Sequence, residues 1–208
     1  AFYKQIKNPI NLSQTRGSSG YFIYSNTGEN ANVYGVEFEA KTDLLKNGDD
    51  EGILNLTGNI TKMWLEQDLL KDFQYKDITT SSLQGASDFI ANGTLSYNNK
   101  KENEFIATLT GNYSSDKIFA LGSPEDFANS AALYNDEIIE KGFIALDLVV
   151  SKEITENLLI KLVGRNLLNP EIKQTQKVRS LITSIETNET VLSYKKGSQL
   201  TVSIKYTF

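Results

Sequence analysis

The feature that most constrains this chain is the alternation of apolar and polar residues in runs of ten or more positions. The clearest run extends from Gln199 to Phe208, where every second residue is apolar. Successive side chains of a β-strand point to opposite faces. One face of this strand therefore carries Leu200, Val202, Ile204, Tyr206 and Phe208, and the other carries Gln199, Thr201, Ser203, Lys205 and Thr207.

Seven more runs of this kind lie upstream. The pattern predicts about eight long strands, at residues 1–10, 31–44, 52–66, 86–99, 104–118, 142–153, 157–168 and 194–208. The connections alternate in length: 46–51, 98–103 and 155–157 are short, whereas 11–30, 67–85, 119–141 and 169–193 are long and polar. Tight turns at one end and long loops at the other are typical of outer-membrane barrels.

A soluble antiparallel sandwich or barrel also alternates, so strand length and charge must separate the two classes. Globular strands usually have about five or six residues, whereas a tilted membrane strand needs about nine to eleven. The polar face also carries charges that a dry core could not hold without pairing. We therefore predict an all-β, antiparallel transmembrane β-barrel whose lumen-facing candidates are Glu37, Glu39, Lys41, Asp147, Lys161, Arg165 and Lys205.

Composition removes most other functions. The 208 residues contain no cysteine and no histidine, which excludes thiol nucleophiles, cysteine metal sites and histidine-based triads. We therefore expect no enzyme activity, no cofactor and no metal site. The net charge of −5 and a pI near 4.9 argue against nucleic acid as a partner. No apolar run is long enough for a transmembrane helix.

Aromatic residues near strand ends suggest where a membrane surface would lie. Trp64, Tyr97 and Tyr113 are candidates for an interfacial girdle, because an amphipathic ring suits the headgroup level. Ordinary cross-strand packing explains each of them equally well. The apolar stripe that ends in Tyr206 and Phe208 looks like the C-terminal signal that the barrel-assembly machinery reads.

Several short segments carry a resemblance to a known family. They are Phe2–Ile10, Tyr24–Gly28, Tyr34–Phe38, Gln84–Phe89, Arg165–Pro170 and the closing strand to Phe208. On these segments the whole chain resembles the C-terminal portion of a TonB-dependent outer-membrane receptor of the Bacteroidetes type. The Gly-Val-Glu and Asn-Leu-Leu-Asn elements, in that order ahead of a terminal Phe, are specific only in combination.

This resemblance implies a barrel of 22 strands with a plug in its lumen, of which residues 1–208 would be the C-terminal third. We expect the plug domain and the TonB box to lie outside this chain. The intact receptor would import a metal chelate, glycan or peptide across the Gram-negative outer membrane with TonB-transmitted energy. The implied partners are outer-membrane lipid, the rest of the barrel and plug, the TonB complex and the barrel-assembly machinery. A surface lipoprotein remains open as a partner.

Two alternatives to the receptor barrel are consistent with parts of the sequence pattern. A self-contained eight-stranded outer-membrane barrel would have a structural or adhesive role, and its narrow interior would force the acidic and basic side chains of the polar face to pair. A wider barrel can leave them in water. A barrel enzyme needs a convergent acid-base set, which the lack of histidine disfavours.

Overall fold

The computed structural model describes residues 1–15, 21–74, 78–99, 101–122, 135–179 and 185–208. Across these ranges the chain is built from strands, apart from the single-turn 3-10 helix η1 (Lys71–Phe73). No helix in the described part of the chain is long and apolar enough to span a membrane.

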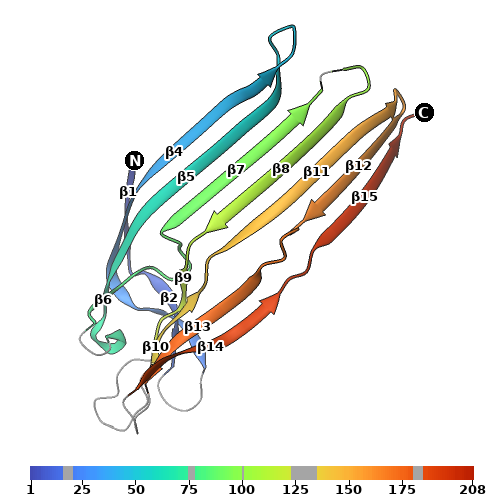
Figure 1. Ribbon diagram of the computed structural model, residues 1–208. Helices are drawn as coiled ribbons and strands as arrows, with labels where there is room; N and C mark the ends of the chain where they lie inside the picture. The colour runs from blue at the N-terminus through green and yellow to red at the C-terminus, as the bar shows by residue number, and fades with distance from the viewer. Residues whose placement is uncertain (16–20, 75–77, 100, 123–134, 180–184) are drawn as a thin grey trace.

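One large antiparallel sheet dominates the molecule (Figure 1). In spatial order it contains β1 (Phe2–Lys7), β4 (Gly28–Lys46), β5 (Gly52–Leu69), β7 (Phe89–Asn98), β8 (Phe105–Ser114), β11 (Phe143–Thr155), β12 (Leu158–Arg165) and β15 (Gln199–Tyr206), and β6 (Thr80–Ser81) pairs with β5. Apart from β6, which lies in the predicted long connection 67–85, each strand of this main sheet corresponds to one predicted alternating run. The all-β, antiparallel prediction is therefore confirmed.

The two ends of the main sheet differ. The β4–β5, β7–β8 and β11–β12 turns and the C-terminus lie together at the upper end in Figure 1, which we call the turn end. All the long connections lie at the opposite end, which we call the loop end. The β4–β5 turn is held by Asn47, whose side-chain oxygen accepts hydrogen bonds from the backbone N–H groups of Asp49 and Glu51 at 3.0 and 2.8 Å.

The long polar segments are not simple loops, and here the structure differs from the sequence-based expectation. They contain β2 (Ile10–Gln14), β3 (Phe22–Asn26), β9 (Lys117–Ala120), β10 (Asn135–Glu140), β13 (Glu171–Arg179) and β14 (Glu186–Lys195). These strands are mostly short or rich in Thr, Glu and Gln. Their apolar periodicity is therefore too weak to stand out from the sequence.

The strands at the loop end continue those of the main sheet across sharp bends. The second sheet has the order β14-β13-β10-β9, which follows the order β15-β12-β11-β8 of the strands from which it extends. Three predicted strands are divided by such bends: 1–10 breaks at Asn8 and Pro9, 104–118 breaks at Ser115 and Asp116, and 194–208 breaks at 196–198. Asn8 has a φ of 53°, in the left-handed region where a strand cannot continue.

The β2–β3 hairpin closes over the β5–β7 connection and reaches the second sheet. The backbone N–H of Leu121 donates to the carbonyl oxygen of Leu12 at 2.8 Å, and that of Gln14 donates to the carbonyl oxygen of Leu121 at 3.1 Å. Ser13 and Leu121 form an isolated parallel bridge at this point. The core lies beneath this contact, where Leu69, Ile118 and Leu121 are buried and pack with Phe73 and Ile139.

Candidate functional site

The polar face of the main sheet gathers the charged residues singled out from the sequence. The register pairs Glu37, Glu39 and Lys41 of β4 with Thr61, Asn59 and Thr57 of β5. Paired residues of neighbouring strands point to the same face. Carried across the sheet, this rule places Glu37, Glu39, Lys41, Asp147, Lys161, Arg165 and Lys205 on one face. Their contact with a lumen stays a prediction.

The centre of the polar face is a set of amide and hydroxyl ladders on β5, β7 and β8. Asn92 Nδ2 donates to Asn59 Oδ1 at 2.8 Å across β5 and β7. The hydroxyl oxygens of Thr94 and Thr110 lie 3.3 Å apart across β7 and β8. The two side chains of each pair satisfy each other's hydrogen-bonding groups and remain partly exposed to solvent.

The charges of the polar face are mostly unpaired. Among the described residues, no ion pair joins Glu37, Glu39, Lys41, Lys161, Arg165 or Lys205 to another side chain. Asp147 instead accepts a hydrogen bond of 2.8 Å from the backbone N–H of Asn166. This capping contact was not anticipated from the sequence.

The opposite, apolar face has rows of aromatic rings near both ends. At the loop end, Tyr34 stacks on Trp64 with ring centroids 5.6 Å apart, and Phe89 and Tyr113 lie 6.1 Å apart. At the turn end, Tyr97 and Phe105 lie 6.0 Å apart. The three girdle candidates thus fall in rows at opposite ends of the face: Trp64 and Tyr113 at the loop end, Tyr97 at the turn end.

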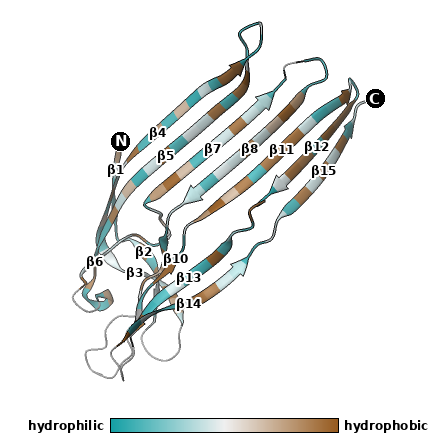
Figure 2. Ribbon diagram, viewed as in Figure 1, coloured by the Kyte–Doolittle hydropathy of each residue, from teal (hydrophilic) through white to brown (hydrophobic). Residues whose placement is uncertain are grey.

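The spacing of these rows is somewhat shorter than the apolar band of about 25 Å between the aromatic girdles of outer-membrane barrels. Phe89 and Tyr97 are eight positions apart on β7, and so are Phe105 and Tyr113 on β8. At about 3.3 Å per residue this is roughly 26 Å along the strand, or about 20 Å across a membrane at a tilt of about 40°. Bands of brown and teal along the main sheet in Figure 2 show the alternation between the two faces. An interfacial role for the aromatics stays a prediction.

Both edges of the main sheet are open. The last strand, β15, pairs only with β12, and its Leu200, Val202 and Ile204 are 68%, 61% and 69% exposed. On the other side, β1 covers β4 only up to Gly35, so the longer part of β4 has an unpaired edge. Beyond β15, the rings of Tyr206 and Phe208 meet edge to face at 5.0 Å. Their role in assembly stays a prediction.

Polar side chains hold the bends at the loop end. Asp116, between β8 and β9, accepts hydrogen bonds from the Lys141 ammonium at 2.8 Å and from the backbone N–H of Gly142 at 2.7 Å. Burial raises the pKa of Asp116, but these hydrogen bonds outweigh it and the pKa lies below its ordinary value. Beside it, hydrogen bonds from Lys62 and Ser115 hold the pKa of Asp88 below its ordinary value.

The bend between β12 and β13 explains the Asn-Leu-Leu-Asn segment. Asn166 and Asn169 have φ angles of 53° and 43° and so bend the chain at the joint, beyond which β13 continues in the general direction of β12. Asn166 Nδ2 donates to the carbonyl oxygen of Gly197 at 2.7 Å, and Asn169 Oδ1 accepts from the backbone N–H of Gly197 at 2.9 Å. A pair of asparagines before proline is a turn signal that could have located this joint from the sequence.

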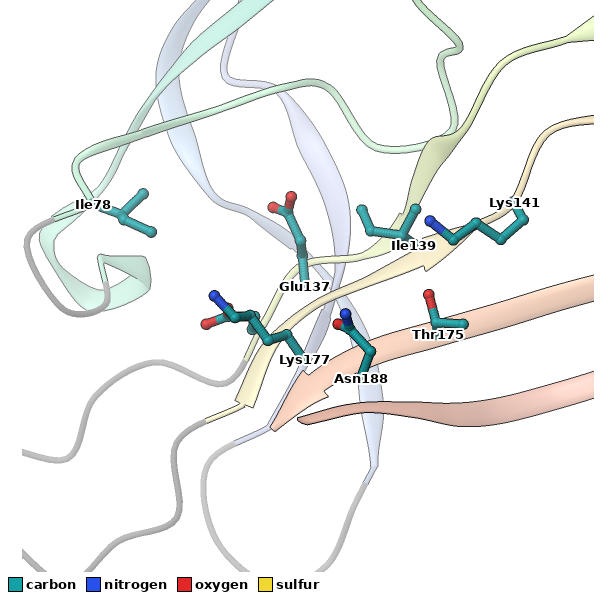
Figure 3. A pocket seen from close by; sticks show the side chains of 8 residues that line it. Ile78, Glu137, Ile139, Lys141, Thr175, Lys177 and Asn188 are labelled. Carbon is teal, nitrogen blue, oxygen red and sulfur yellow. The ribbon is translucent and has the colours of Figure 1, made fainter. Parts of the chain in front are cut away.

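A shallow pocket lies on the second sheet, at the loop end (Figure 3). Its walls come from β10, from Lys141 directly after β10, from β13 and β14, and from Ile78 of the β5–β6 connection; the other lining residues are Asp136, Glu137, Ile139, Thr175, Lys177 and Asn188. Lys177 forms an ion pair of 2.7 Å with Glu186, which together with Asp136 raises the pKa of Lys177. Within the described ranges, no cluster of acidic side chains is placed to hold a metal ion.

A comparison with known protein families identifies the family to which this sheet belongs. The model of the family described as TonB dependent receptor-like, beta-barrel matches residues 1–167. The chain belongs to this family. No curated protein and no solved structure was found to match.

Membership assigns the receptor barrel to a family of transporters rather than enzymes, located in the outer membrane of Gram-negative bacteria. The family implies a barrel, a plug and an interaction with TonB. The open sheet, with an apolar face, a polar face and a folded extension at one end, is consistent with a piece of such a barrel wall. The match ends at Leu167, within the joint that leads into the β13–β14 hairpin.

Proposed function

We propose that this chain forms wall and external loops of an outer-membrane receptor that binds and imports a nutrient with TonB-transmitted energy. A metal chelate, a glycan and a peptide are the candidate cargo classes. We further propose that the receptor is of the Bacteroidetes type, with about 22 strands, and that the plug and TonB box lie outside this chain. The barrel-assembly machinery, and a surface lipoprotein over the loops, are proposed partners.

The observation that carries this proposal is the open sheet with two chemically different faces. The strands at its two edges, β1 and β15, lie at opposite ends of the strand order and do not pair. Unpaired strand edges are costly in a membrane, since no water can satisfy their backbone groups. Further strands from the same receptor would cover both edges and close the barrel.

The unpaired charges favour a wide barrel over a self-contained eight-stranded one. A narrow interior would bring the acidic Glu37 and Glu39 against the basic Lys161 and Lys205, because buried charges need partners. A lumen wide enough for water leaves such charges solvated. The self-contained barrel remains the second candidate, and one experiment separates the two.

That experiment is refolding of residues 1–208 alone in detergent micelles. A fragment of a larger barrel is expected to remain protease-sensitive and to lack the heat-dependent gel mobility of a closed barrel. A compact, heat-modifiable monomer would instead support the eight-stranded alternative.

Transport itself is tested in the source bacterium with the intact receptor. Deletion of its gene is expected to slow growth when one cargo class is the limiting source, and the restored gene should recover growth only where TonB is present. Unchanged growth on limiting metal chelates, glycans and peptides alike would contradict an import function.

A further inference from the structure

The β2–β3 hairpin at the loop end buries polar side chains and exposes apolar ones. One face carries Asn11, Ser13, Ile23 and Ser25, of which Asn11 and Ser13 are buried; the other carries Ile10, Leu12, Phe22 and Tyr24, which we call the hairpin patch. Ile10, Phe22 and Tyr24 are 68%, 40% and 71% exposed, and Leu12 is partly buried. A half-buried antiparallel sheet ordinarily turns its apolar face inward. An exposed apolar patch of this kind is often functional.

The buried side of the hairpin is held by neutral hydrogen bonds. Asn11 Nδ2 donates to Thr27 Oγ1 at 2.6 Å and to Gln67 Oε1 at 2.9 Å. Asn11 Oδ1 accepts from the backbone N–H of Gln84 at 3.1 Å, and Gln67 Nε2 donates to the carbonyl oxygen of Ser82 at 2.9 Å. The side-chain amides of Asn11 and Gln67 are thus satisfied within the protein. A satisfied buried network favours one arrangement, so the hairpin is a rigid support for the patch.

Gln67 shows on which side of the main sheet the hairpin lies. The register that pairs Glu37 with Thr61 continues without a shift to Ala31 and Gln67, so the Gln67 side chain points to the polar face. The hairpin therefore stacks on the polar-face side of β5, and the hairpin patch is turned away from β5. This position lies on the side opposite to the lipid that the apolar face is expected to contact.

The size of the hairpin patch indicates what kind of partner it fits. A large aromatic side chain contributes about 150–250 Å², and the patch consists of two partly exposed rings and two aliphatic side chains, which gives roughly 400 Å². A stable protein–protein interface buries about 800 Å² on each partner. The patch is therefore too small to hold a protein stably, and it matches one side of a small molecule.

The chemistry of the hairpin patch favours an aromatic partner. Leu12 and Tyr24 are direct cross-strand partners, and Ile10 and Phe22 are each two positions away along their strands, so the four side chains form one continuous surface. This surface carries no formal charge, and the Tyr24 hydroxyl is its only polar side-chain group. Aromatic rings attract one another beyond the effect of the area that they bury.

We propose that the hairpin patch is a subsite that binds an aromatic ring of the cargo. This inference rests on the proposed function, because it requires a cargo molecule at the loop end. Of the three candidate cargo classes, a metal chelate or a peptide can carry such a ring, whereas a glycan does not. The patch therefore narrows the cargo to a small molecule with an aromatic group.

The first test measures the binding of two probes that differ by an aromatic ring, phenyl β-D-glucopyranoside and methyl β-D-glucopyranoside. Each is titrated into the intact receptor in lipid nanodiscs and followed by saturation-transfer NMR. The parent receptor is expected to bind the phenyl glucoside about tenfold more tightly. Tyr24→Ala should remove most of this preference, whereas Tyr24→Phe keeps the ring and should retain it. Tyr194→Ala, which removes an exposed ring from β14, is the matched control.

Equal affinity of the parent receptor for the two probes would overturn the inference, and this result is also expected if another part of the receptor covers the patch. Phe22→Ala is a second variant in case Tyr24→Ala fails to assemble, and both side chains lie on the face opposite to the buried network. A preference for the phenyl glucoside that is unchanged in these variants would likewise rule out the hairpin patch as the binding site.

The second test separates this inference from the proposed function. Where deletion of the receptor gene slows growth on a limiting cargo, Tyr24→Ala with Phe22→Ala should raise the cargo concentration for half-maximal growth about tenfold at an equal surface level of receptor. Tyr194→Ala should leave that concentration unchanged. An unchanged concentration in the double variant would overturn the subsite alone. Unchanged growth of the deletion strain on every cargo class would instead be a failure of the proposed function.

Discussion

The backbone N–H of Asn166 donates a hydrogen bond of 2.8 Å to Oδ1 of Asp147, so a carboxylate on β11 caps the bend that ends β12. The backbone N–H of Leu167 adds a hydrogen bond of 2.8 Å to the carbonyl oxygen of Leu146. Together these contacts connect the main sheet to the base of the β13–β14 hairpin. A residue singled out as a lumen charge thus also has a structural role.

Removing this cap should loosen the joint. Asp147→Ala is expected to cost about 1–2 kcal/mol, because an N–H loses a charged acceptor. Asp147→Asn retains a side-chain oxygen and should cost less. Denaturant titration of the intact receptor measures the difference, and limited proteolysis of the hairpin gives an independent readout. Equal stability of the Ala and Asn variants would contradict the capping role.

Gly197 occupies the facing bend with a φ of +84°. A Cβ placed there has no neighbour within 4 Å, so any cost of substitution arises from the backbone conformation alone. Gly197→Ala should therefore destabilise the receptor by about 1 kcal/mol. Gly48→Ala is the matched control, since its Cβ would also meet open space without a positive φ. The two variants are compared by denaturant titration, and equal midpoints would exclude the strain argument.

The apolar face is expected to contact lipid. Leu148→Arg or Ile160→Arg should cost about 2–4 kcal/mol near the middle of the membrane, whereas Thr201→Arg on the polar face should have a small effect. Folding titrations of the intact receptor in lipid vesicles measure these changes. Equal costs on both faces would mean that the lipid-facing assignment is wrong.

Acidic pH should weaken the bends at Asp88 and Asp116. Both carboxyls have a pKa below the ordinary value of 3.8 in the folded chain, so their stabilisation is complete above pH 3.8. It is lost as the pH falls from 3.8 through the lowered pKa values. Thermal unfolding of the intact receptor between pH 7 and pH 2.5 checks this. The double variant Asp88→Asn/Asp116→Asn should have a flatter profile, and an identical profile would contradict the linkage.

The terminal aromatic pair is expected to act during assembly. Phe208 is fully exposed and contacts the ring of Tyr206, so deleting it should change the stability of the sheet little. We expect that deletion to lower the surface level of the intact receptor several-fold, whereas Thr207→Ser should leave it unchanged. Immunoblots of outer-membrane fractions give the measurement. Normal levels after the deletion would count against a terminal signal.

Much of the main sheet could be predicted from local alternation. The run from Leu200 to Phe208 and its counterparts upstream establish all eight main strands and separate the apolar from the polar side chains, because the period of two is a property of neighbouring residues. The same alternation sorts Glu37 and Lys161 onto the polar side of their strands. This alternation can be read from the residues of one strand, without knowing which strands pair with it.

The loop end depended on contacts between residues far apart in the chain. The bridge between Ser13 and Leu121 joins two segments that the sequence predicts only as polar connections. The cap between Asp147 and Asn166 joins two predicted strands by a contact that alternation does not reveal. The alternation within a strand determines which of its sides is apolar. Which side chains become neighbours across strands depends on the register and the bends, and these are set by hydrogen bonds across the whole sheet.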